Sequence, residues 1–264
     1  MMGRKTPNLH QQIVALLKEL RMPAIRQNYQ SEAQRARAET LSYEQYLLEL
    51  LRREAEVRRE NRIQRHLLQS KLPLEKNMAS FDLKRLPLNV QQKVKLLLES
   101  SFLDRRENVL VFGNPGSGKS HLTCAIAQEL IYQDRRVLFN RCDALVQDLL
   151  AAKQEIKLNK LLKRTTKFNA ILIDDIGYVQ QSREEMEVLF TLLAECYERT
   201  SVMLTSNLPF SKWEQIFKDP LTTAAAIDRL VHHSIILELN VKSYRMEQAK
   251  KKKRITDKKP DNNQ

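Results

Sequence analysis

The segment from Gly113 to Gly118 constrains the fold of this 264-residue chain more than any other feature of its sequence. The chain contains five glycines, three of them in this segment, whereas average usage predicts about 18 in all. An apolar run, Val109–Phe112, precedes the segment, and a helical pattern follows it. A glycine loop between a buried strand and a helix lets backbone N–H groups surround an anion, and the helix N-terminus adds partial positive charge. The sequence therefore predicts an α/β domain that binds phosphate at the end of its first strand.

The loop matches the Walker A pattern GxxxxGK[ST] at every fixed position. In this motif the lysine neutralises the β- and γ-phosphates of ATP and the following hydroxyl ligates Mg²⁺, which assigns these roles to Lys119 and Ser120. A chance match in a tight strand–helix turn is the alternative, and the strand–loop–helix context argues against it. The predicted ATP-binding residues are Gly113, Asn114, Pro115, Gly116, Ser117, Gly118, Lys119, Ser120 and His121.

A second motif, Ala170–Asp175, is an apolar run that ends in two acids, the form of a Walker B strand. A buried parallel strand delivers such residues to the carboxyl edge of its sheet, where ligands bind. We expect Asp174 to hold Mg²⁺ through water and Asp175 to polarise the attacking water as a general base. An ordinary strand end with a turn cap is the alternative, and the position downstream of a Walker A motif favours catalysis.

Two further positions are candidates for catalysis. Asn207 follows another apolar run and is predicted to orient the attacking water or contact the γ-phosphate; an ordinary loop asparagine before Pro209 is the alternative. Arg229 lies near the end of a helix and could stabilise charge on the γ-phosphate of a neighbouring subunit. Periodicity alone favours a solvated arginine paired with Asp228.

The pattern of the chain predicts its fold class, which is α/β. The first 70 residues have the apolar spacing of helices, with a capping box at Ser42–Gln45. Alternating strands and helices from about residue 89 are typical of a doubly wound parallel sheet. Five strands are predicted, at Asn108–Phe112, Arg136–Asn140, Asn169–Ile173, Ser201–Thr205 and Ser234–Leu239. Helices are predicted at Asn89–Ser100, Lys119–Tyr132, Asp143–Lys153, Ser182–Arg199, Ser211–Phe217 and Thr222–Leu230.

The net charge of +13 is concentrated at the two ends of the chain. Residues 1–80 carry +6, residues 81–240 carry +1 and residues 241–264 carry +6. A polyanion, most simply nucleic acid, is the expected partner of the ends, with solubility alone as the alternative. We predict four regions, which are a helical basic domain at 1–70, a linker at 71–88, an ATPase core at 89–240 and a basic, disordered tail at 241–264.

Two basic stripes are candidates for contact with DNA. The first consists of four residues at the spacing of one helix face, Lys153, Lys157, Lys160 and Arg164. The second lies in the N-terminal domain and consists of Arg58, Arg59, Arg62 and Arg65. A solvated or salt-bridged helix face is the alternative for each. Neither stripe carries a base-reading signature, so we expect double-stranded DNA to bind with weak sequence preference and strong salt dependence.

Several segments together resemble one family. The order GNPGSGKS, ILIDDIG, LTSNLPFSKW and AAAIDRLVHH, preceded by ENRIQR, closely resembles the IstB family of transposition helper ATPases, over about residues 5–246. That family belongs with DnaA and DnaC in one AAA+ clade. The resemblance implies an AAA+ core in an ATP-assembled helical homo-oligomer that wraps or bends DNA, recruits the cognate transposase and stimulates strand transfer.

The resemblance also bears on single residues. It implies that Arg229 acts in trans and that the first basic stripe lies in a DNA-contacting insertion. Asp175 stands where many AAA+ proteins carry glutamate, which suggests slow hydrolysis. Little chain follows residue 240, so we expect little or no lid domain, with Arg245 as the nearby candidate for a lid arginine.

Composition excludes some classes of protein. No apolar run approaches the roughly 18 residues of a membrane span, and the three cysteines form no CxxC pair, which argues against a zinc site or a disulfide scaffold. We therefore expect a cytoplasmic protein with no membrane partner. Two other functions remain open, which are a helicase loader of DnaC type and a non-enzymatic DNA-coating scaffold that ATP holds together.

Overall fold

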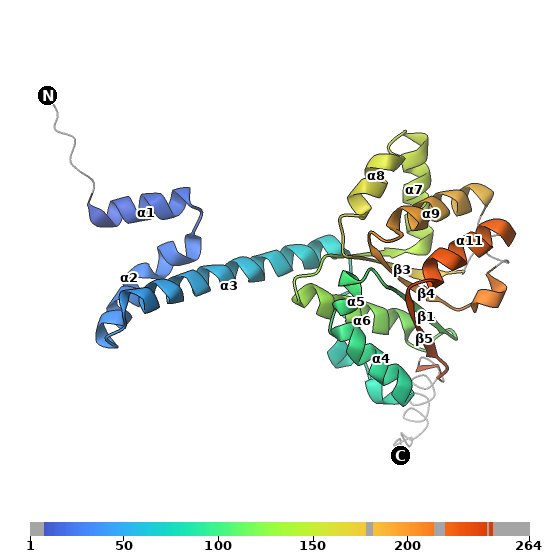
Figure 1. Ribbon diagram of the computed structural model, residues 1–264, viewed down its shortest axis with the longest axis horizontal. Coiled ribbons are helices and arrows are strands. Elements are labelled where there is room, and N and C mark those ends of the chain that lie inside the picture. Colours follow the sequence, from blue (N-terminus) through green and yellow to red (C-terminus); the bar gives the residue numbers. More distant parts are fainter. Residues whose placement is uncertain (1–7, 178–181, 214–219, 242, 245–264) are drawn as a thin grey trace, which may run out of the picture. The chain divides into compact units, whose positions relative to one another are not determined.

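The computed structural model describes residues 8–177, 182–213, 220–241 and 243–244 of the chain. The chain divides into two compact units between Arg65 and His66. The first is helical, and the second contains a parallel sheet between layers of helices (Figure 1).

The first unit is built from α1 (Leu9–Glu19), α2 (Pro23–Ala38) and α3, which runs from Tyr43 to Ser70 and so enters the second unit. Side-chain capping fixes the helix starts. Ser42 accepts a hydrogen bond from the N–H of Gln45, whose side chain accepts one from the N–H of Ser42. The capping box predicted from the sequence is confirmed.

A buried carboxylate of α3 fastens the start of α2. Glu54 is 4% exposed and accepts hydrogen bonds from the N–H groups of Ala24 and Ile25, at 2.8 and 3.1 Å. A negative charge at a helix N-terminus is stabilising because unpaired N–H groups point toward it. Arg58 pairs with Glu54 at 2.9 Å and donates to the carbonyl of Arg21 at 2.6 Å. Arg58, predicted as a DNA contact, therefore also holds the helices of this unit together.

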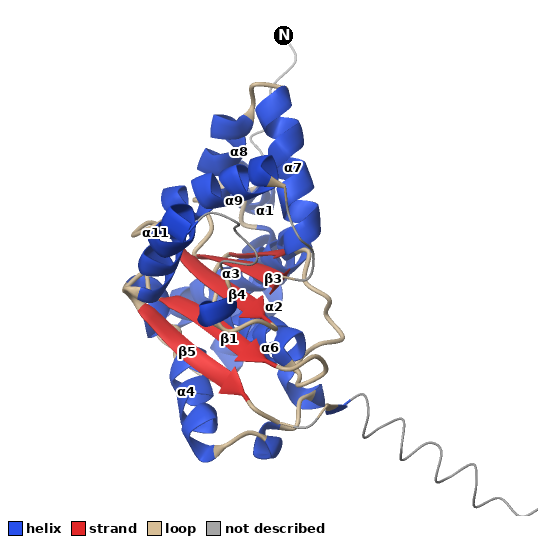
Figure 2. Ribbon diagram, turned by 90° about the vertical axis from the view of Figure 1, so that its right-hand side faces the viewer, coloured by secondary structure: helices blue, strands red, loops and turns tan. Residues whose placement is uncertain are grey.

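The second unit contains a five-stranded, fully parallel sheet in the order β2-β3-β4-β1-β5 (Figure 2). The strands are β1 (Asn108–Gly113), β2 (Val137–Arg141), β3 (Ala170–Ile176), β4 (Ser201–Ser206) and β5 (Ser234–Leu239). The five predicted strands are confirmed to within a few residues at their ends. Because the strands are parallel, β1, β3 and β4 all end at the same edge of the sheet.

Helices cover both faces of this sheet (Figure 2). One layer contains α4 (Leu88–Leu98) and α6 (Lys119–Tyr132), with the short α5 (Ser101–Asp104) beside α4. The other layer contains α7 (Cys142–Gln154), α8 (Leu158–Thr165), α9 (Arg183–Cys196) and α11 (Pro220–Val231). Three short 3₁₀ turns, η1 (Met78–Ser80), η2 (Leu83–Arg85) and η3 (Phe210–Lys212), complete the elements of the described residues. The helix predicted at 211–217 falls partly outside those residues.

The helices of this chain end without glycine. Non-glycine residues with left-handed backbone follow α1, α4, α6 and α7, among others, at Arg21, Ser100, Asp134 and Ile156. A residue after a helix commonly adopts this conformation, usually as glycine, because it lets the last carbonyls accept hydrogen bonds. The low glycine content is therefore reached at some cost in backbone strain.

The first basic stripe does not lie on one helix, so this prediction was wrong. Ile156, with φ +58°, lies between the end of α7 and the start of α8, and the N–H of Lys157 bonds back to the carbonyl of Ala152 at 2.7 Å. Lys153 remains on α7 and pairs with Glu187 at 3.2 Å. The helical spacing is broken because a left-handed residue reverses the chain direction, which charge periodicity does not reveal.

The remaining members of that stripe keep part of the predicted arrangement. Lys157 precedes α8 and pairs with Glu155 at 2.8 Å, whereas Lys160 and Arg164 are exposed on α8. Leu162 of α8 is 4% exposed and belongs to the hydrophobic core. The helix is therefore amphipathic, with a basic outer face that the sequence predicted on a longer helix.

Candidate functional site

The Walker A loop connects β1 to α6 in the strand–loop–helix order predicted from the sequence. Gly116 and Gly118 have φ values of +80° and +99°, which L side chains rarely adopt. A Cβ at Gly116 would overlap Ser243 Oγ, and one at Gly118 would lie 3.1 Å from the Phe81 ring. Both positions require glycine, because the backbone is left-handed there and neighbouring side chains fill the space that a Cβ would take.

Lys119 opens α6 with a buried ammonium group. The residue is 5% exposed, and its Nζ donates to the carbonyls of Gly113 and Asn114, at 2.8 and 3.2 Å. Burial of a charge requires hydrogen-bonding partners, and here the loop itself supplies them. The ammonium therefore lies at the loop, within the site where the motif would hold phosphate.

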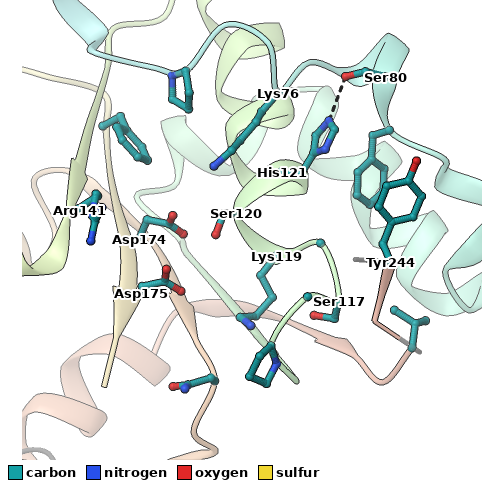
Figure 3. A pocket seen from close by; sticks show the side chains of 18 of the residues that line it. Lys76, Ser80, Ser117, Lys119, Ser120, His121, Arg141, Asp174, Asp175 and Tyr244 are labelled. Carbon is teal, nitrogen blue, oxygen red and sulfur yellow. Dashed lines mark hydrogen bonds between the residues drawn. The ribbon is translucent and has the colours of Figure 1, made fainter. Parts of the chain in front are cut away.

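A cavity of about 750 Å³ lies above this loop (Figure 3). It brings together the loop residues from Pro115 to His121, both acids of β3, and Asn207 after β4. These segments are distant in sequence but meet here because the parallel strands end at one edge of the sheet. The cavity thus collects the predicted Walker A, Walker B and Asn207 groups, and Arg229 is not among its lining residues.

The two acids of β3 reach the cavity through a bulge. The pairing of β3 with β4 shifts between Ile173 and Ile176, so Asp174 and Asp175 together oppose Thr205. Asp175 has φ +62°, a strained value for a non-glycine residue. Side chains of successive strand residues normally point to opposite faces, and the bulge is what allows both acids to line one cavity.

The environments of the two acids differ. Asp174 is 4% exposed and accepts a hydrogen bond from Thr205 Oγ1 at 2.6 Å, whereas Asp175 is exposed within the cavity. Loss of hydration raises the pKa of Asp175, and the Asp174 carboxylate raises it further because like charges repel. The cations Lys119 and Arg141 partly oppose this rise in the pKa. A carboxylate that binds protons more readily than usual is suited to accept one from water.

Two buried oxygens of the site have no hydrogen-bond partner within the described chain, Ser117 Oγ and Asn207 Oδ1. Buried polar atoms are normally paired, so each such atom requires an explanation. Polar contacts to a bound nucleotide and to an ordered water would satisfy both. The residues present therefore fit a nucleoside triphosphate.

The site also fits Mg²⁺ bound jointly with a nucleotide. The hydroxyl of Ser120 and the carboxylate of Asp174 line the same cavity (Figure 3). Within the described ranges no group of three His, Cys, Asp or Glu side chains could hold a metal by itself. Mg²⁺ commonly takes only one or two protein ligands and completes its shell with water and phosphate oxygens, which matches this donor set.

One wall of the cavity comes from the segment predicted as a linker. Residues 71–88 pack on α6 (Figure 3), and Gln128 of α6 donates to the carbonyl of Lys76 at 3.1 Å. His121, also predicted to bind ATP, lies 3.0 Å from Ser80 Oγ and edge-on to the ring of Phe81. Lys76 lines the cavity as well. The two prolines of this segment indicated a linker, and only its aromatic and basic residues could have indicated a binding wall.

The predicted tail contributes to that same wall. Tyr244 donates its backbone N–H to the carbonyl of Gly116 at 2.9 Å, and the guanidinium carbon of Arg85 lies 4.9 Å from the centre of the Tyr244 ring. An aromatic ring beside a glycine loop offers a surface for stacking a base. The sequence placed Tyr244 outside the core, and Arg245 lies outside the described residues.

Arg229 does not form the ion pair that periodicity favoured. Its guanidinium carbon lies 4.9 Å from the centre of the Phe190 ring on α9, and Nη1 is buried without a hydrogen-bond partner in the part of the chain described. A guanidinium held by a ring keeps its hydrogen-bonding groups available.

The remaining predicted DNA contacts are exposed. Arg59, Arg62 and Arg65 lie on the continuous helix α3.

No helix among the described residues is long and apolar enough to cross a membrane. Within the described residues the three cysteines are buried and form no disulfide.

Comparison with known proteins identifies the family of the chain. The family model described as IstB-like ATP binding protein matches residues 15–252. An insertion sequence ATP-binding protein of Sinorhizobium fredii is 40% identical over 240 residues, covering 90% of this chain and 80% of the relative. The IS21 ATP-binding protein of Pseudomonas aeruginosa is 34% identical and covers 91% of each chain.

Solved structures share the fold. The DnaC helicase loader matches with a TM-score of 0.53 at 15% identity, covering 64% of this chain and 97% of that one. AMPPCP-bound DnaA from Aquifex aeolicus matches with a TM-score of 0.54 at 19% identity, covering 74% and 58%. These likenesses show that the chain shares the α/β fold of those proteins. With a family model matching most of its length, the chain belongs to the IstB-like ATP-binding family of insertion sequences.

Proposed function

We propose that this protein is a Mg²⁺-dependent ATPase that assembles on double-stranded DNA and there recruits and stimulates the transposase of its insertion sequence. The observation that carries the proposal is the cavity in which the Walker A loop, both acids of β3 and Asn207 meet. Family membership supports ATP binding and a role with insertion sequences.

The residues of the cavity divide the chemistry of hydrolysis among them. Lys119 neutralises charge on the phosphates, while Ser120 and Asp174 hold Mg²⁺, which supplies further charge neutralisation when bound. Asp175 accepts a proton from the attacking water, and the raised pKa of its carboxyl supports that role. The free Oδ1 of Asn207 accepts a hydrogen bond that orients the same water. Aspartate at this position, in place of the longer glutamate, makes hydrolysis slow.

Arg229 completes the site of a neighbouring subunit. It does not line the cavity of its own chain, and its buried Nη1 has no partner within the described residues. Movement of the side chain away from Phe190 and into a neighbour's site would satisfy that group and stabilise the charge that develops on the γ-phosphate. The proposal therefore requires a homo-oligomer.

Basic residues of both units contact the phosphate backbone. On α8 these are Lys160 and Arg164, which are exposed on the face opposite the core, and on α3 they are Arg59, Arg62 and Arg65. Arginine and lysine bound to phosphates set affinity without reading sequence. The contact is therefore strongly salt-dependent and weakly sequence-dependent. The absence of a disulfide among the three described cysteines supports a reducing, cytoplasmic location.

The test measures phosphate release by the purified chain with Mg²⁺, with and without duplex DNA, beside a Lys119→Ala variant. We expect slow release that duplex DNA stimulates, loss of release in EDTA, and no nucleotide binding by Lys119→Ala. Absence of DNA-stimulated release would favour the ATP-held scaffold. Recovery of a hexameric helicase instead of the transposase in a pull-down would favour the helicase loader.

A further inference from the structure

Thr205 lies at the centre of the β3 bulge and is not one of the groups that the proposed chemistry uses. It is the fifth residue of β4, two positions before Asn207, and its exposure is 0%. The β3–β4 register places it opposite both Asp174 and Asp175. Its single hydroxyl therefore occupies the point where the regular ladder of hydrogen bonds is interrupted.

That hydroxyl makes two hydrogen bonds, one to each acid. Thr205 Oγ1 donates to Asp174 Oδ1 at 2.6 Å and accepts from the backbone N–H of Asp175 at 2.8 Å. The first bond fixes the carboxylate of Asp174. The second satisfies the N–H that the bulge removes from the ladder of the sheet.

The second hydrogen bond also supports a strained backbone. Asp175 has φ +62°, a conformation that costs an aspartate energy and persists only when its surroundings impose it. Without the bulge, alternation along β3 would send Asp174 and Asp175 to opposite faces of the sheet. The orientation of Asp175 into the cavity thus depends on the hydroxyl of a residue on another strand.

We propose that Thr205 is a positioning residue for ATP hydrolysis, whose hydroxyl sets Asp174 for Mg²⁺ and Asp175 for water through one bulge. This inference rests on the proposed roles of the two acids. It makes metal binding and proton acceptance depend on one side chain that reaches neither the nucleotide nor the water. Partners of this kind typically contribute 10- to 100-fold to metal affinity or activity.

The test compares Thr205→Val, which keeps the shape and removes the hydroxyl, with Thr205→Ser, which keeps the hydroxyl. The matched control is Thr200→Val. Thr200 lies at the opposite end of β4, is 2% exposed, and donates to the carbonyls of Thr166 and Phe168. The Thr200→Val variant thus also loses a buried hydroxyl, but at the edge of the sheet that lies away from the cavity.

Three readouts separate positioning from a general loss of stability. For Thr205→Val we expect turnover to fall roughly 10- to 100-fold and the gain in affinity for a fluorescent ATP analogue on adding Mg²⁺ to fall about tenfold. Affinity in EDTA stays unchanged because the Walker A loop is intact. Hydrogen exchange at the Asp175 amide loses its protection. Thr205→Ser restores all three, and Thr200→Val resembles the wild type in all three.

Two results would overturn the inference. One is a Thr205→Val variant with wild-type turnover and an unchanged Mg²⁺-dependent gain in affinity; the other is an equal loss of both in Thr200→Val. Failure of the proposed function has a different signature, since wild-type turnover by Asp175→Asn would refute the role of the acid itself. If Asp175→Asn loses turnover while Thr205→Val keeps wild-type turnover and an unchanged Mg²⁺-dependent gain in affinity, only the positioning role is refuted.

Discussion

Replacement of Asp175 by asparagine should stabilise the folded protein while it abolishes hydrolysis. The carboxyl has a raised pKa because the cavity removes part of its hydration and Asp174 repels its charge. Asparagine removes the charge, keeps the shape and tolerates left-handed backbone better than most residues, which suits φ +62°. Nucleotide binding should survive, because Lys119 and the Walker A loop are unchanged.

The sign of the effect on stability follows from the direction of the pKa shift. A carboxyl whose pKa is higher in the folded than in the unfolded state destabilises the fold when ionised, and this penalty is absent below the unfolded pKa. The advantage of Asp175→Asn should therefore be absent in acid, grow as the pH rises through the folded pKa of Asp175, and be complete at neutral pH. The raised pKa of Asp175 also affects the pH profile of wild-type turnover. Turnover should begin to fall on the acid side at a higher pH than it would with an aspartate of ordinary pKa.

The size of the gain is limited because Asp175 is exposed within the cavity. Single stabilising substitutions commonly yield about 0.5–2 kcal/mol, and solvent screening places this one near the lower end of that range. For a unit of about 200 residues, a gain near 0.5 kcal/mol corresponds to a rise in melting temperature of roughly 1–2 °C. Turnover should fall by about 10²- to 10⁴-fold, the usual contribution of a general base.

Thermal unfolding without nucleotide, followed by circular dichroism at neutral and acidic pH, measures the first effect, and phosphate release measures the second. Asp104→Asn is a control of opposite sign, since Asp104 is exposed outside the cavity and accepts two hydrogen bonds from Arg135, each of 2.8 Å. That variant should be neutral or slightly destabilised and should hydrolyse ATP normally. A destabilised Asp175→Asn, or one that turns over at the wild-type rate, would refute the reasoning.

Three further outcomes are expected from the structure. Arg229→Ala should bind ATP normally but lose up to about 10³-fold in turnover, and mixing it with Asp175→Asn subunits should restore some activity; no recovery in the mixture argues against action in trans. Neutralising Lys160 and Arg164 together to glutamine should flatten the slope of log affinity against log salt by about 2, and an unchanged slope in DNA titrations would place the contact elsewhere. Glu54→Ala should destabilise the helical unit by about 2–3 kcal/mol, because two N–H groups of α2 and the Arg58 charge lose their partner; chemical unfolding monitored by helicity checks this, and a change below about 0.5 kcal/mol would contradict it.

Much of the candidate site was predictable because its residues are encoded by short local patterns. The Walker A loop, from Gly113 to Ser120, carries its own turn chemistry, and the strand before it carries its apolar run. Asp174 and Asp175 end another such run, and parallel strands place their carboxyl ends at one edge whatever the details of packing. The same local signals predicted the five strands and the helical first unit.

Other features depend on contacts between residues far apart in sequence. The bulge that brings both acids to one side of the sheet is hydrogen-bonded to the hydroxyl of Thr205 on another strand, and periodicity alone would have placed the two carboxylates on opposite faces. The wall formed by residues 71–88 was interpreted as a linker, since its prolines are visible in the sequence and its packing on α6 is not.

The sequence by itself determined which segments become strands and helices, where phosphate is held and which acids stand near it, because hydrophobic period and glycine placement act over a few residues. Only the tertiary structure decided how individual side chains are oriented. It engaged Arg58 with the carbonyl of Arg21 in the first unit and set Asp175 on a bulge. Each of these orientations depends on a hydrogen bond or a packing contact with a distant residue, and a linear pattern contains no record of such contacts.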